Sequence, residues 1–453
     1  MLYKPSAYNV HLPGGAVFNT VSGSFVKPTE QQLDWLDQPF PLAGDAEPPE
    51  AFTALRQGGF VMPDEAREAL MLKARWYEAV TSDRAPTLTI APTMNCNFGC
   101  DYCFESHEPG IMSAEVRTQL EKFITAQLAA QAAYPLHVTW FGGEPLMGLS
   151  AILDLSDRFD RLVEQGVLSD WSAFMITNGH LLTPKTVKRL EGRRISGFQI
   201  TIDGPREIHD VRRVLKAGRK ATFDTICGNI VALPEPYEVS IRVNVDRRNA
   251  TELEQLAHQL WENGVLRRPG TSLYLANVEN YDRPDLAETA TVLSNREFAG
   301  VQQRFLRFCT DHGYPCSDEG VSTSLQGVCQ VDNVNAFVVD SDGSLMKCWA
   351  ELRNRPQVVA HLCDESTWPE PVLSSFEDRD PFDDDECMSC PVLPLCMGAC
   401  PKLREMRRNF DFKMCPPIKH CLTDVLQRKA SEMDLDAGHA IQDRTTQLKE
   451  LAR

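Results

Sequence analysis

From residue 88 onward, short apolar, β-branched runs alternate with longer stretches in which apolar residues recur every three or four positions. The runs predict buried strands, and the longer stretches predict amphipathic helices. The predicted strands are LTIAPT (88–93), HVTWFGG (137–143), FMITNG (174–179), GFQITIDG (197–204), SIRVNVD (240–246) and SLYLANV (272–278). The predicted helices include SAEVRTQLEKFITAQLAAQ, TPKTVKRLEG and NATELEQLAHQLWENG. Repeated strand-then-helix units predict an α/β fold with a parallel sheet, and six units fit a partial (β/α)6 TIM-like barrel.

The first 85 residues follow a different pattern. The apolar runs AYNVHL, AVFNT and SFV are separated by the turn signals Gly14-Gly15 and Ser22-Gly23, which predicts a small antiparallel sheet. Thr29 is the expected cap of a helix through QQLDWLD, followed by helices near AFTALRQ and in PDEAREALMLKARWYEAV. A few strands with three helices indicate a winged-helix-like module, and a structural cap on the next domain is the alternative.

The segment 309–421 is rich in prolines and short of apolar periodicity. Nine of the 15 cysteines lie between residues 329 and 421. Such a segment buries little apolar area, so it needs another source of order, and the cysteines indicate bound metal. The remaining residues, 422–453, predict one or two solvated helices. The expected organisation is therefore a recognition module (1–85), a barrel (86–308), a cysteine-rich domain (309–421) and a helical tail (422–453).

Composition and charge narrow the class of protein. Hydrophobic residues make up 43% and charged residues 24%, which is typical of a folded globular chain. The net charge of −17 argues against nucleic acid or anionic lipid as partners, and no apolar run is long enough to span a membrane. An odd cysteine count and an opening without an apolar signal segment predict a cytoplasmic protein whose thiols bind metal.

The sharpest chemical signal is Cys96-Asn-Phe-Gly-Cys100-Asp-Tyr-Cys103, placed directly after the first predicted strand. Three thiolates on a short loop can hold three irons of a 4Fe-4S cluster and leave the fourth iron open. A zinc knuckle is the alternative, but it lacks a fourth ligand. The dipeptides Gly142-Gly143, Asn178-Gly179 and Asp203-Gly204 end the next three strands. Strand ends of a parallel barrel share one face, so these residues are expected to line one site.

CNFGCDYC resembles the cluster loop of the radical S-adenosylmethionine (SAM) superfamily. The resemblance implies that SAM chelates the open iron and is cleaved to a 5′-deoxyadenosyl radical, which abstracts a hydrogen atom from the substrate. Phe141-Gly-Gly-Glu-Pro145 resembles the GGE strand end of that family, whose glycines admit the methionine part of SAM and whose glutamate accepts from its ammonium group. The implied SAM contacts are Tyr102, Gly142, Gly143, Glu144, Asn178, Thr201, Asp203, Arg213 and Arg242. Ordinary turns and a barrel-mouth salt bridge remain open as structural explanations.

A second cysteine pattern is C-x13-G-x4-C over Cys329, Gly343 and Cys348, followed by C-x2-C-x5-C-x3-C and a final cysteine. This pattern resembles the SPASM extension of radical SAM enzymes and implies two auxiliary 4Fe-4S clusters. For the first, the resemblance implies Cys329, Cys348 and Cys400, with Cys316 as the preferred fourth ligand and Cys309 as the alternative. For the second, it implies Cys387, Cys390, Cys396 and Cys415. A zinc ribbon is the alternative for 387–400. A hairpin with Asp342-Gly343 as its turn is expected between Phe337 and Cys348.

SPASM proteins mostly act on ribosomally made peptides or proteins, and the N-terminal module resembles the element that binds a precursor's leader by strand addition. The expected function is therefore a peptide maturase that installs a thioether or carbon-carbon crosslink, with a precursor peptide and an electron donor such as flavodoxin or ferredoxin as partners. A sulfatase-type maturase that oxidises Cys or Ser to formylglycine is the alternative. Trp349 disfavours it, because those relatives carry an acidic residue after the equivalent of Cys348. A zinc-stabilised peptide-binding adaptor would leave the CNFGCDYC loop unexplained.

Overall fold

The computed structural model describes residues 1–41, 49–81, 85–103, 105–128, 134–279, 291–317, 329–352, 357–368, 380–407, 415–433 and 440–442. The chain divides into two compact units. The first unit combines residues 1–80 with 376–453, and the second combines 81–318 with 329–375. The cysteine-rich segment predicted for 309–421 is thus divided between the two units, and the four predicted domain ranges stay predictions.

The second unit is built on a parallel sheet that contains all six predicted strands. These are β7 (Thr87–Ile90), β8 (Pro135–Trp140), β9 (Asp170–Thr177), β10 (Ile195–Thr201), β11 (Glu238–Val245) and β12 (Thr271–Asn277). They pair in chain order, each parallel to its neighbours. The prediction of an α/β fold with successive βα units is confirmed. The first strand ends at Ile90, earlier than predicted, and the following residues begin the cysteine loop.

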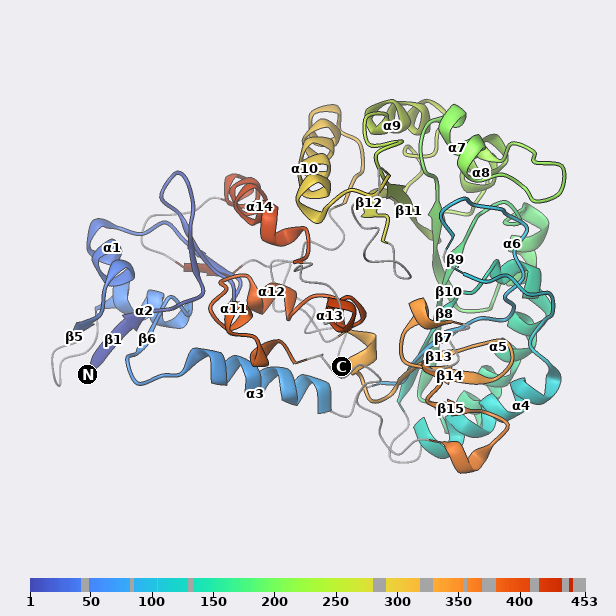
Figure 1. The fold of residues 1–453 in the computed structure, drawn as a ribbon, viewed down its shortest axis with the longest axis horizontal. Helices are drawn as coiled ribbons and strands as arrows, with labels where there is room; N and C mark the ends of the chain where they lie inside the picture. Colours follow the sequence, from blue (N-terminus) through green and yellow to red (C-terminus); the bar gives the residue numbers. More distant parts are fainter. Residues whose placement is uncertain are drawn as a thin grey trace. The chain divides into compact units, whose positions relative to one another are not determined.

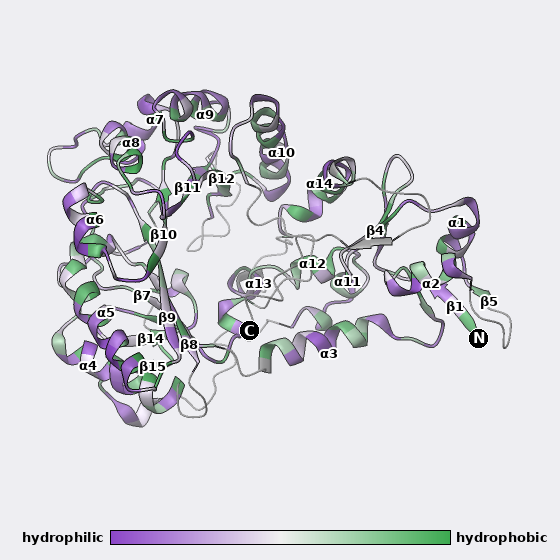
Figure 2. Cartoon of the chain, turned by 180° about the vertical axis from the view of Figure 1, so that it is seen from behind, coloured by the Kyte–Doolittle hydropathy of each residue, from purple (hydrophilic) through white to green (hydrophobic). Residues whose placement is uncertain are grey.

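Helices connect these strands, and Figure 1 shows α4, α5 and α6 together along one side of the sheet. Their bounds are α4 (Ala114–Phe123), which continues as a π-helix to Leu128, α5 (Leu149–Glu164), α6 (Pro184–Leu190), α7 (Arg206–Arg212), α8 (Phe223–Val231), α9 (Leu253–Glu262) and α10 (Asn295–His312). Hydrophobic and hydrophilic residues alternate along α5 (Figure 2), and its Ile152, Leu155 and Phe159 are fully buried. The apolar face of α5 is therefore buried, as expected of an amphipathic helix that packs on a sheet. Residues 129–131, the end of one predicted helix, lie outside the described residues.

The sheet continues beyond β7 with a hairpin from the cysteine-rich segment. Strand β13 (Ala336–Val339) runs parallel to β7, and β14 (Ser344–Met346) and β15 (Ala360–His361) follow antiparallel. The predicted turn is confirmed, with Gly343 at φ +96°, a conformation that favours glycine. At the opposite edge, Cys316 bridges to Leu273 of β12 and is joined to Cys309 by a disulfide.

In the first unit, the predicted N-terminal module is present in outline. Strands β2 (Asn9–His11), β3 (Val17–Asn19) and β4 (Ser24–Val26) form an antiparallel sheet. Helices α1 (Glu30–Asp37), α2 (Glu50–Gln57) and α3 (Glu68–Thr81) follow, as expected. Thr29 caps α1 through a capping box with Gln32, as its sequence position predicted.

Two features of this unit were not predicted. A second small sheet pairs β1 (Leu2–Pro5) with β5 (Phe40–Pro41) and β6 (Val61–Pro63). Strand β16 (Ala440–Gln442) pairs antiparallel with β4, so the sheet order is β16-β4-β3-β2. The edge of β4 is therefore occupied by β16, and β2 ends the sheet on its other side among the described residues. Strand addition of a leader to an edge of this module stays a prediction.

The C-terminal part of the first unit consists of short helices before one longer helix. These are α11 (Asp385–Met388), α12 (Leu393–Cys396), α13 (Pro401–Arg407) and α14 (Ile418–Glu432). Helix α14 agrees with the predicted helical tail, while β16 adds a strand to it and the rest of 434–453 lies outside the described residues. None of the described helices is both long and apolar enough to cross a membrane.

Candidate functional site

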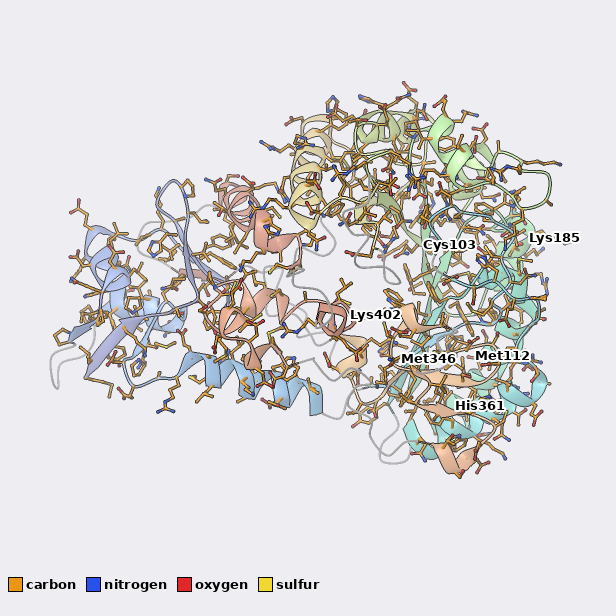
Figure 3. All side chains as sticks on the ribbon, in the orientation of Figure 1. Cys103, Met112, Lys185, Met346, His361 and Lys402 are labelled. Carbon is orange, nitrogen blue, oxygen red and sulfur yellow. A yellow bond between two sulfur atoms is a disulfide. The ribbon has the colours of Figure 1, made fainter. Side chains whose placement is uncertain are left out.

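A cavity of about 220 Å³ opens at the carboxyl ends of the parallel strands in the second unit. All three cysteines of the loop after β7 line it: Cys96 is buried, Cys100 is half-buried and Cys103, labelled in Figure 3, is exposed. The other predicted site residues in the lining are Tyr102, Gly142, Gly143, Asn178, Thr201, Arg213 and Arg242. Glu144 and Asp203 are fully buried and are not part of the described lining.

Gly142 and Gly143 let the turn after β8 pack directly on the cysteine loop. Gly142 has φ +101°, and a Cβ there would lie 2.5 Å from the Thr93 carbonyl oxygen. A Cβ on Gly143 would lie 2.5 Å from the carbonyl oxygens of both Met94 and Asn95. The backbone of Glu144 also donates to Asn95 O at 2.9 Å. Both glycines line the cavity. Because they lack a Cβ, the cysteine loop can also lie in direct contact with the backbone of this turn.

The Glu144 carboxylate joins the ends of β8 and β9. It accepts from Thr177 Oγ1 at 2.8 and 3.0 Å, from the Asn178 backbone N–H at 2.8 Å and from the Leu146 N–H at 3.0 Å. Burial raises the pKa of Glu144, and these hydrogen bonds oppose the shift. Its direct contact with SAM stays a prediction, because the contacts described here hold the strand ends together.

Asn178 links β9 to the cysteine loop. Its side-chain Nδ2 donates to Asn97 Oδ1 at 2.8 Å, and its Oδ1 accepts from the His180 N–H at 3.0 Å. The loop is further held by main-chain bonds from Gly99 to Val214 and from Lys216 to Asn97. The loop is thus fixed by the residues after β9 and by those after α7.

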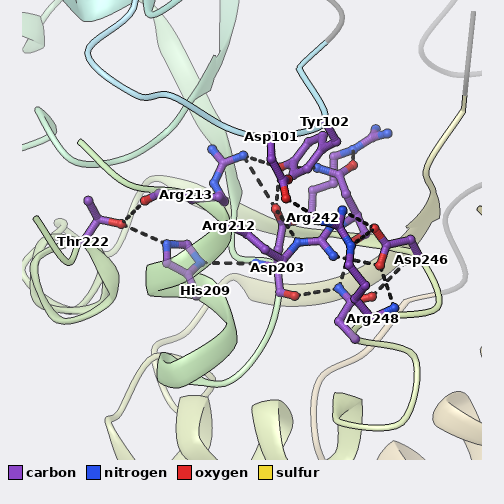
Figure 4. Close-up of polar contacts among 12 residues, drawn as sticks. Asp101, Tyr102, Asp203, His209, Arg212, Arg213, Thr222, Arg242, Asp246 and Arg248 are labelled. Carbon is purple, nitrogen blue, oxygen red and sulfur yellow. Dashed lines mark hydrogen bonds and ion pairs between the residues drawn. The ribbon is translucent and has the colours of Figure 1, made fainter. Parts of the chain in front are cut away.

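A buried hydrogen-bonded group connects Tyr102 to the ends of β10 and β11 (Figure 4). The Tyr102 hydroxyl donates to Asp203 and accepts from Arg213 Nη1 at 2.5 Å and from Asn244 Nδ2 at 3.1 Å. Burial raises the pKa of Tyr102 well above its usual value. Burial works against the charge on Arg213, but Tyr102, Cys100 and Asp203 outweigh it and raise the Arg213 pKa. Among the described residues, no hydrogen-bond partner is found for the buried Arg213 Nε, while other parts of this side chain line the cavity.

Figure 4 also shows a chain of charges behind that group. Arg212 Nη1 lies 2.8 Å from Asp246 Oδ1, and Arg248 lies 2.6 Å from Asp246 Oδ2 and 2.5 Å from Asp101 Oδ2. Hydrogen bonds from both arginines hold the pKa of Asp246 below its usual range, although burial opposes this. Asp101 lies between Cys100 and Tyr102, so these ion pairs tie the cysteine loop to the end of β11.

Burial raises the pKa of Cys96 to about 12 and that of Cys103 to about 11. Thiols in this setting release protons when a metal binds them. Three sulfur donors lie in one cavity wall, with room and the Arg213 side chain beside them. This arrangement suits a cluster with three cysteine ligands and one position for another molecule. The residues present therefore fit the group that the sequence implied.

Several lining residues were missed by sequence reasoning. Burial, with Asp340 and Glu144 adding to it, raises the pKa of Glu105 to about 8. Burial raises the pKa of Glu279 to about 7 against the opposing charge of Arg242. Cys103, Glu105 and His107 have ligand atoms within 4.8 Å of one another, an arrangement that could also hold a single metal ion. The only available signal was their closeness in sequence to Cys103 or to the end of β12.

The lining also includes the aromatic rings of Phe98, Phe141 and Trp349. The ring centroids of Phe141 and Trp349 lie 5.6 Å apart. Trp349 directly follows Cys348, at the position where an acidic residue is expected in a sulfatase-type maturase.

In the first unit, Cys387, Cys390, Cys396 and Cys415 line a second cavity. They come from α11, α12 and the residues between them and before α14. Residues 397–399, which follow Cys396, all have positive φ (43°, 82° and 66°), and this tight turn brings the Gly398 N–H to the Cys396 sulfur. Four thiols around one cavity fit a four-cysteine cluster or zinc site equally well as a donor set.

The set predicted for the first auxiliary cluster is divided. Cys329 and Cys348 precede short 3-10 turns of the second unit, and Cys400 belongs to the first unit. Cys316 is bonded to Cys309 here, so a ligand role for either requires the reduced form. This ligand set stays a prediction.

Comparison with known proteins adds independent findings. Residues 90–260 match the Radical SAM superfamily. Over 375 residues the chain is 23% identical to the cysteine-type anaerobic sulfatase-maturating enzyme of Clostridium perfringens, a match that covers 72% of this chain and 92% of the relative. Over 359 residues it is 25% identical to the serine-type anaerobic sulfatase-maturating enzyme of Klebsiella pneumoniae, covering 73% of this chain and 85% of the relative.

Two solved structures share the fold. Native anSMEcpe with bound AdoMet and the Cp18Cys peptide has a TM-score of 0.59 at 20% identity and covers 77% of this chain and all of that one. Streptococcus suis SuiB bound to the precursor peptide SuiA has a TM-score of 0.50 at 12% identity and covers 88% of this chain and 95% of that one. At these identities the likeness shows the fold alone.

Proposed function

This chain carries a radical SAM domain and is homologous to anaerobic sulfatase-maturating enzymes, and on that premise we propose that it is a SAM-dependent maturase of a ribosomally synthesised precursor peptide. The observation that carries the proposal is the single cavity lined by the three loop cysteines, the two glycines after β8 and Arg213. When bound, SAM and a reduced 4Fe-4S cluster supply a 5′-deoxyadenosyl radical that takes a hydrogen atom from the peptide.

Within this proposal, Cys96, Cys100 and Cys103 hold the catalytic cluster. Arg213 is the partner for an anionic group of SAM, because its charged side chain lines the cavity beside the cysteine loop. Gly142, Gly143, Asn178, Thr201 and Arg242 contact SAM or the peptide from the lining. Tyr102, Asp203 and Glu144 act mainly by fixing the positions of these groups, since their polar atoms bond to the surrounding protein.

The peptide substrate is supported by the N-terminal module, in which two small antiparallel sheets accompany helices α1, α2 and α3. The aromatic and carboxyl groups in the cavity support it too. The anSMEcpe and SuiB structures hold peptides in those proteins. For this chain we propose a crosslink, thioether or carbon-carbon, as the product. Two auxiliary clusters and an external electron donor such as flavodoxin or ferredoxin would carry the electrons.

Formylglycine formation is the second candidate, favoured by identity to sulfatase maturases over nearly three quarters of the chain. Against it stands Trp349, an indole ring beside Phe141 at the position where a carboxylate is expected. The two candidates differ in product. A crosslink removes two hydrogen atoms and leaves no aldehyde. Conversion of a cysteine to formylglycine replaces its sulfur by oxygen, and conversion of a serine removes two hydrogen atoms but leaves an aldehyde that a carbonyl reagent labels.

The first experiment is anaerobic reconstitution followed by metal analysis. The wild-type chain is expected to bind about twelve irons, as three clusters of four, and to convert SAM to 5′-deoxyadenosine with dithionite. Zinc in place of iron, or no SAM cleavage, would contradict both enzymatic candidates. Mass spectrometry of a peptide encoded beside the gene, compared with a sulfatase-derived peptide, then separates them.

Cys100→Ala is expected to abolish SAM cleavage and remove about four irons while about eight remain. Cys363→Ala is the matched control, because Cys363 is exposed and has no proposed ligand role. Loss of all iron in Cys100→Ala would contradict the separation of the sites.

A further inference from the structure

Two cationic side chains reach the sulfur atoms of the four-cysteine cavity in the first unit. Lys419 Nζ donates to Cys390 Sγ at 3.2 Å, and Arg404 Nη1 donates to Cys387 Sγ at 3.6 Å. Both side chains line the cavity itself. Lys419 lies in the first turn of α14 and Arg404 lies in α13, so separate elements bring the two charges to one place.

The position of Arg404 is fixed by its surroundings. It is buried, and its guanidinium also donates to the carbonyl oxygens of Gly398 at 3.3 Å and of Asp380 at 3.4 Å. A Cβ on Gly398 would lie 2.8 Å from Arg404 Nη1 and 2.7 Å from Pro381 Cβ. Gly398, at φ +82°, therefore makes room for the guanidinium, and its N–H also bonds the Cys396 sulfur.

These contacts place positive charge where a cluster would carry negative charge. Four thiolates around a 4Fe-4S core leave a net negative charge that increases by one on reduction. Hydrogen bonds to the sulfurs and nearby charge are among the factors that set the potential of such clusters. Glu386 also lines the cavity, so the two cations outnumber the acidic groups in the described lining.

We propose that Lys419 and Arg404 raise the reduction potential of the cluster held by Cys387, Cys390, Cys396 and Cys415, through hydrogen bonds to two of its sulfur ligands. The inference rests on the second auxiliary cluster of the proposed function. It goes beyond that proposal by assigning two residues that hold no iron themselves. They act through the ligands and make the cluster an easier acceptor for an electron released by the substrate.

The test is a potentiometric titration of the full-length, anaerobically reconstituted protein, followed by electron paramagnetic resonance. Lys419→Gln removes the charge and is expected to shift the midpoint of one cluster to a more negative potential with the iron content unchanged. Lys419→Arg keeps the charge and is expected to keep the wild-type midpoint. Lys429→Gln makes the same charge change ten residues further along α14, about 15 Å away, and is expected to leave every midpoint unchanged.

Three other results would contradict the proposal. An unchanged midpoint in Lys419→Gln, with iron retained, overturns the tuning role and leaves the proposed function intact. Loss of iron from Lys419→Gln overturns it too, because Lys419 would then be needed for assembly. If the wild-type chain itself holds zinc or no cluster at these cysteines, the iron analysis reveals this first and the cluster assignment fails with the inference.

Discussion

Gly143 lies where the turn after β8 meets the loop that carries Cys96. A Cβ added at this position would lie 2.5 Å from the carbonyl oxygens of Met94 and Asn95. Both neighbours are backbone atoms, so no side-chain rotation relieves the contact. Gly143→Ala therefore forces either the turn or the cysteine loop to move.

An extra methyl group in a closely packed site typically lowers the free energy of unfolding by about 1–3 kcal/mol. In a chain of 453 residues each kcal/mol lowers the melting temperature by roughly 1 °C. Gly143→Ala is therefore expected to melt roughly 1–3 °C below wild type without metal. Displacement of the loop should also reduce the iron bound by the cysteines beside it, and with it the cleavage of SAM.

Gly228→Ala is the matched control. Gly228 lies within helix α8, and a Cβ there meets nothing within 4 Å. Alanine in a helix is favoured over glycine by roughly 0.5–1 kcal/mol, so this variant should melt at or slightly above the wild-type temperature. The melting temperature and the bound iron of both variants are compared with wild type under anaerobic conditions. A Gly143→Ala protein with wild-type melting and wild-type SAM cleavage would refute the reasoning.

Two further predictions concern buried carboxyl groups. Glu144→Gln should lower the free energy of unfolding by about 1–3 kcal/mol, because an amide nitrogen would face one of the N–H or O–H donors that the carboxylate now satisfies. An unchanged melting curve would contradict this. Burial raises the pKa of Glu279 to about 7, so its contribution to stability is complete below the ordinary glutamate pKa and is lost as pH rises to about 7. Glu279→Gln should flatten that part of the pH profile of thermal unfolding; an unchanged slope would contradict the assignment.

Much of the fold could be predicted because its signals are local. The six strands of the second unit are runs of β-branched and apolar residues, and Thr29 with Gln32 marks the start of α1 in the sequence itself. The parallel pairing of β13 with β7 joins residues about 250 positions apart and has no local signal. The same holds for β16, whose three residues carry too little pattern to be recognised as a strand.

The parts of the candidate site that depend on the spacing of residues in the sequence could be predicted. The parts that depend on packing between distant segments could not. The cysteine loop and the glycines after β8 were found from their order alone, and the cavity brings them together. The burial of Glu144 and Asp203 behind the lining depends on partners from other strands, such as Thr177 and Asn244. Lys419 is likewise an ordinary helix-surface lysine in the sequence, and only the fold brings it to Cys390.

Any peptide that binds to the edge of β4 competes with strand β16 for the same backbone groups. An extended peptide that pairs with β4 has to displace residues 440–442, which belong to the same chain. A tethered segment competes at an effective concentration that is commonly on the order of mM, whatever the amount of protein in the assay. Removing residues 440–442 would leave β4 paired with β3 on one side and unpaired on the other. Such an open edge can bind peptides more readily and can also join other chains. The apparent affinity of this edge for any peptide therefore includes the free energy needed to release β16.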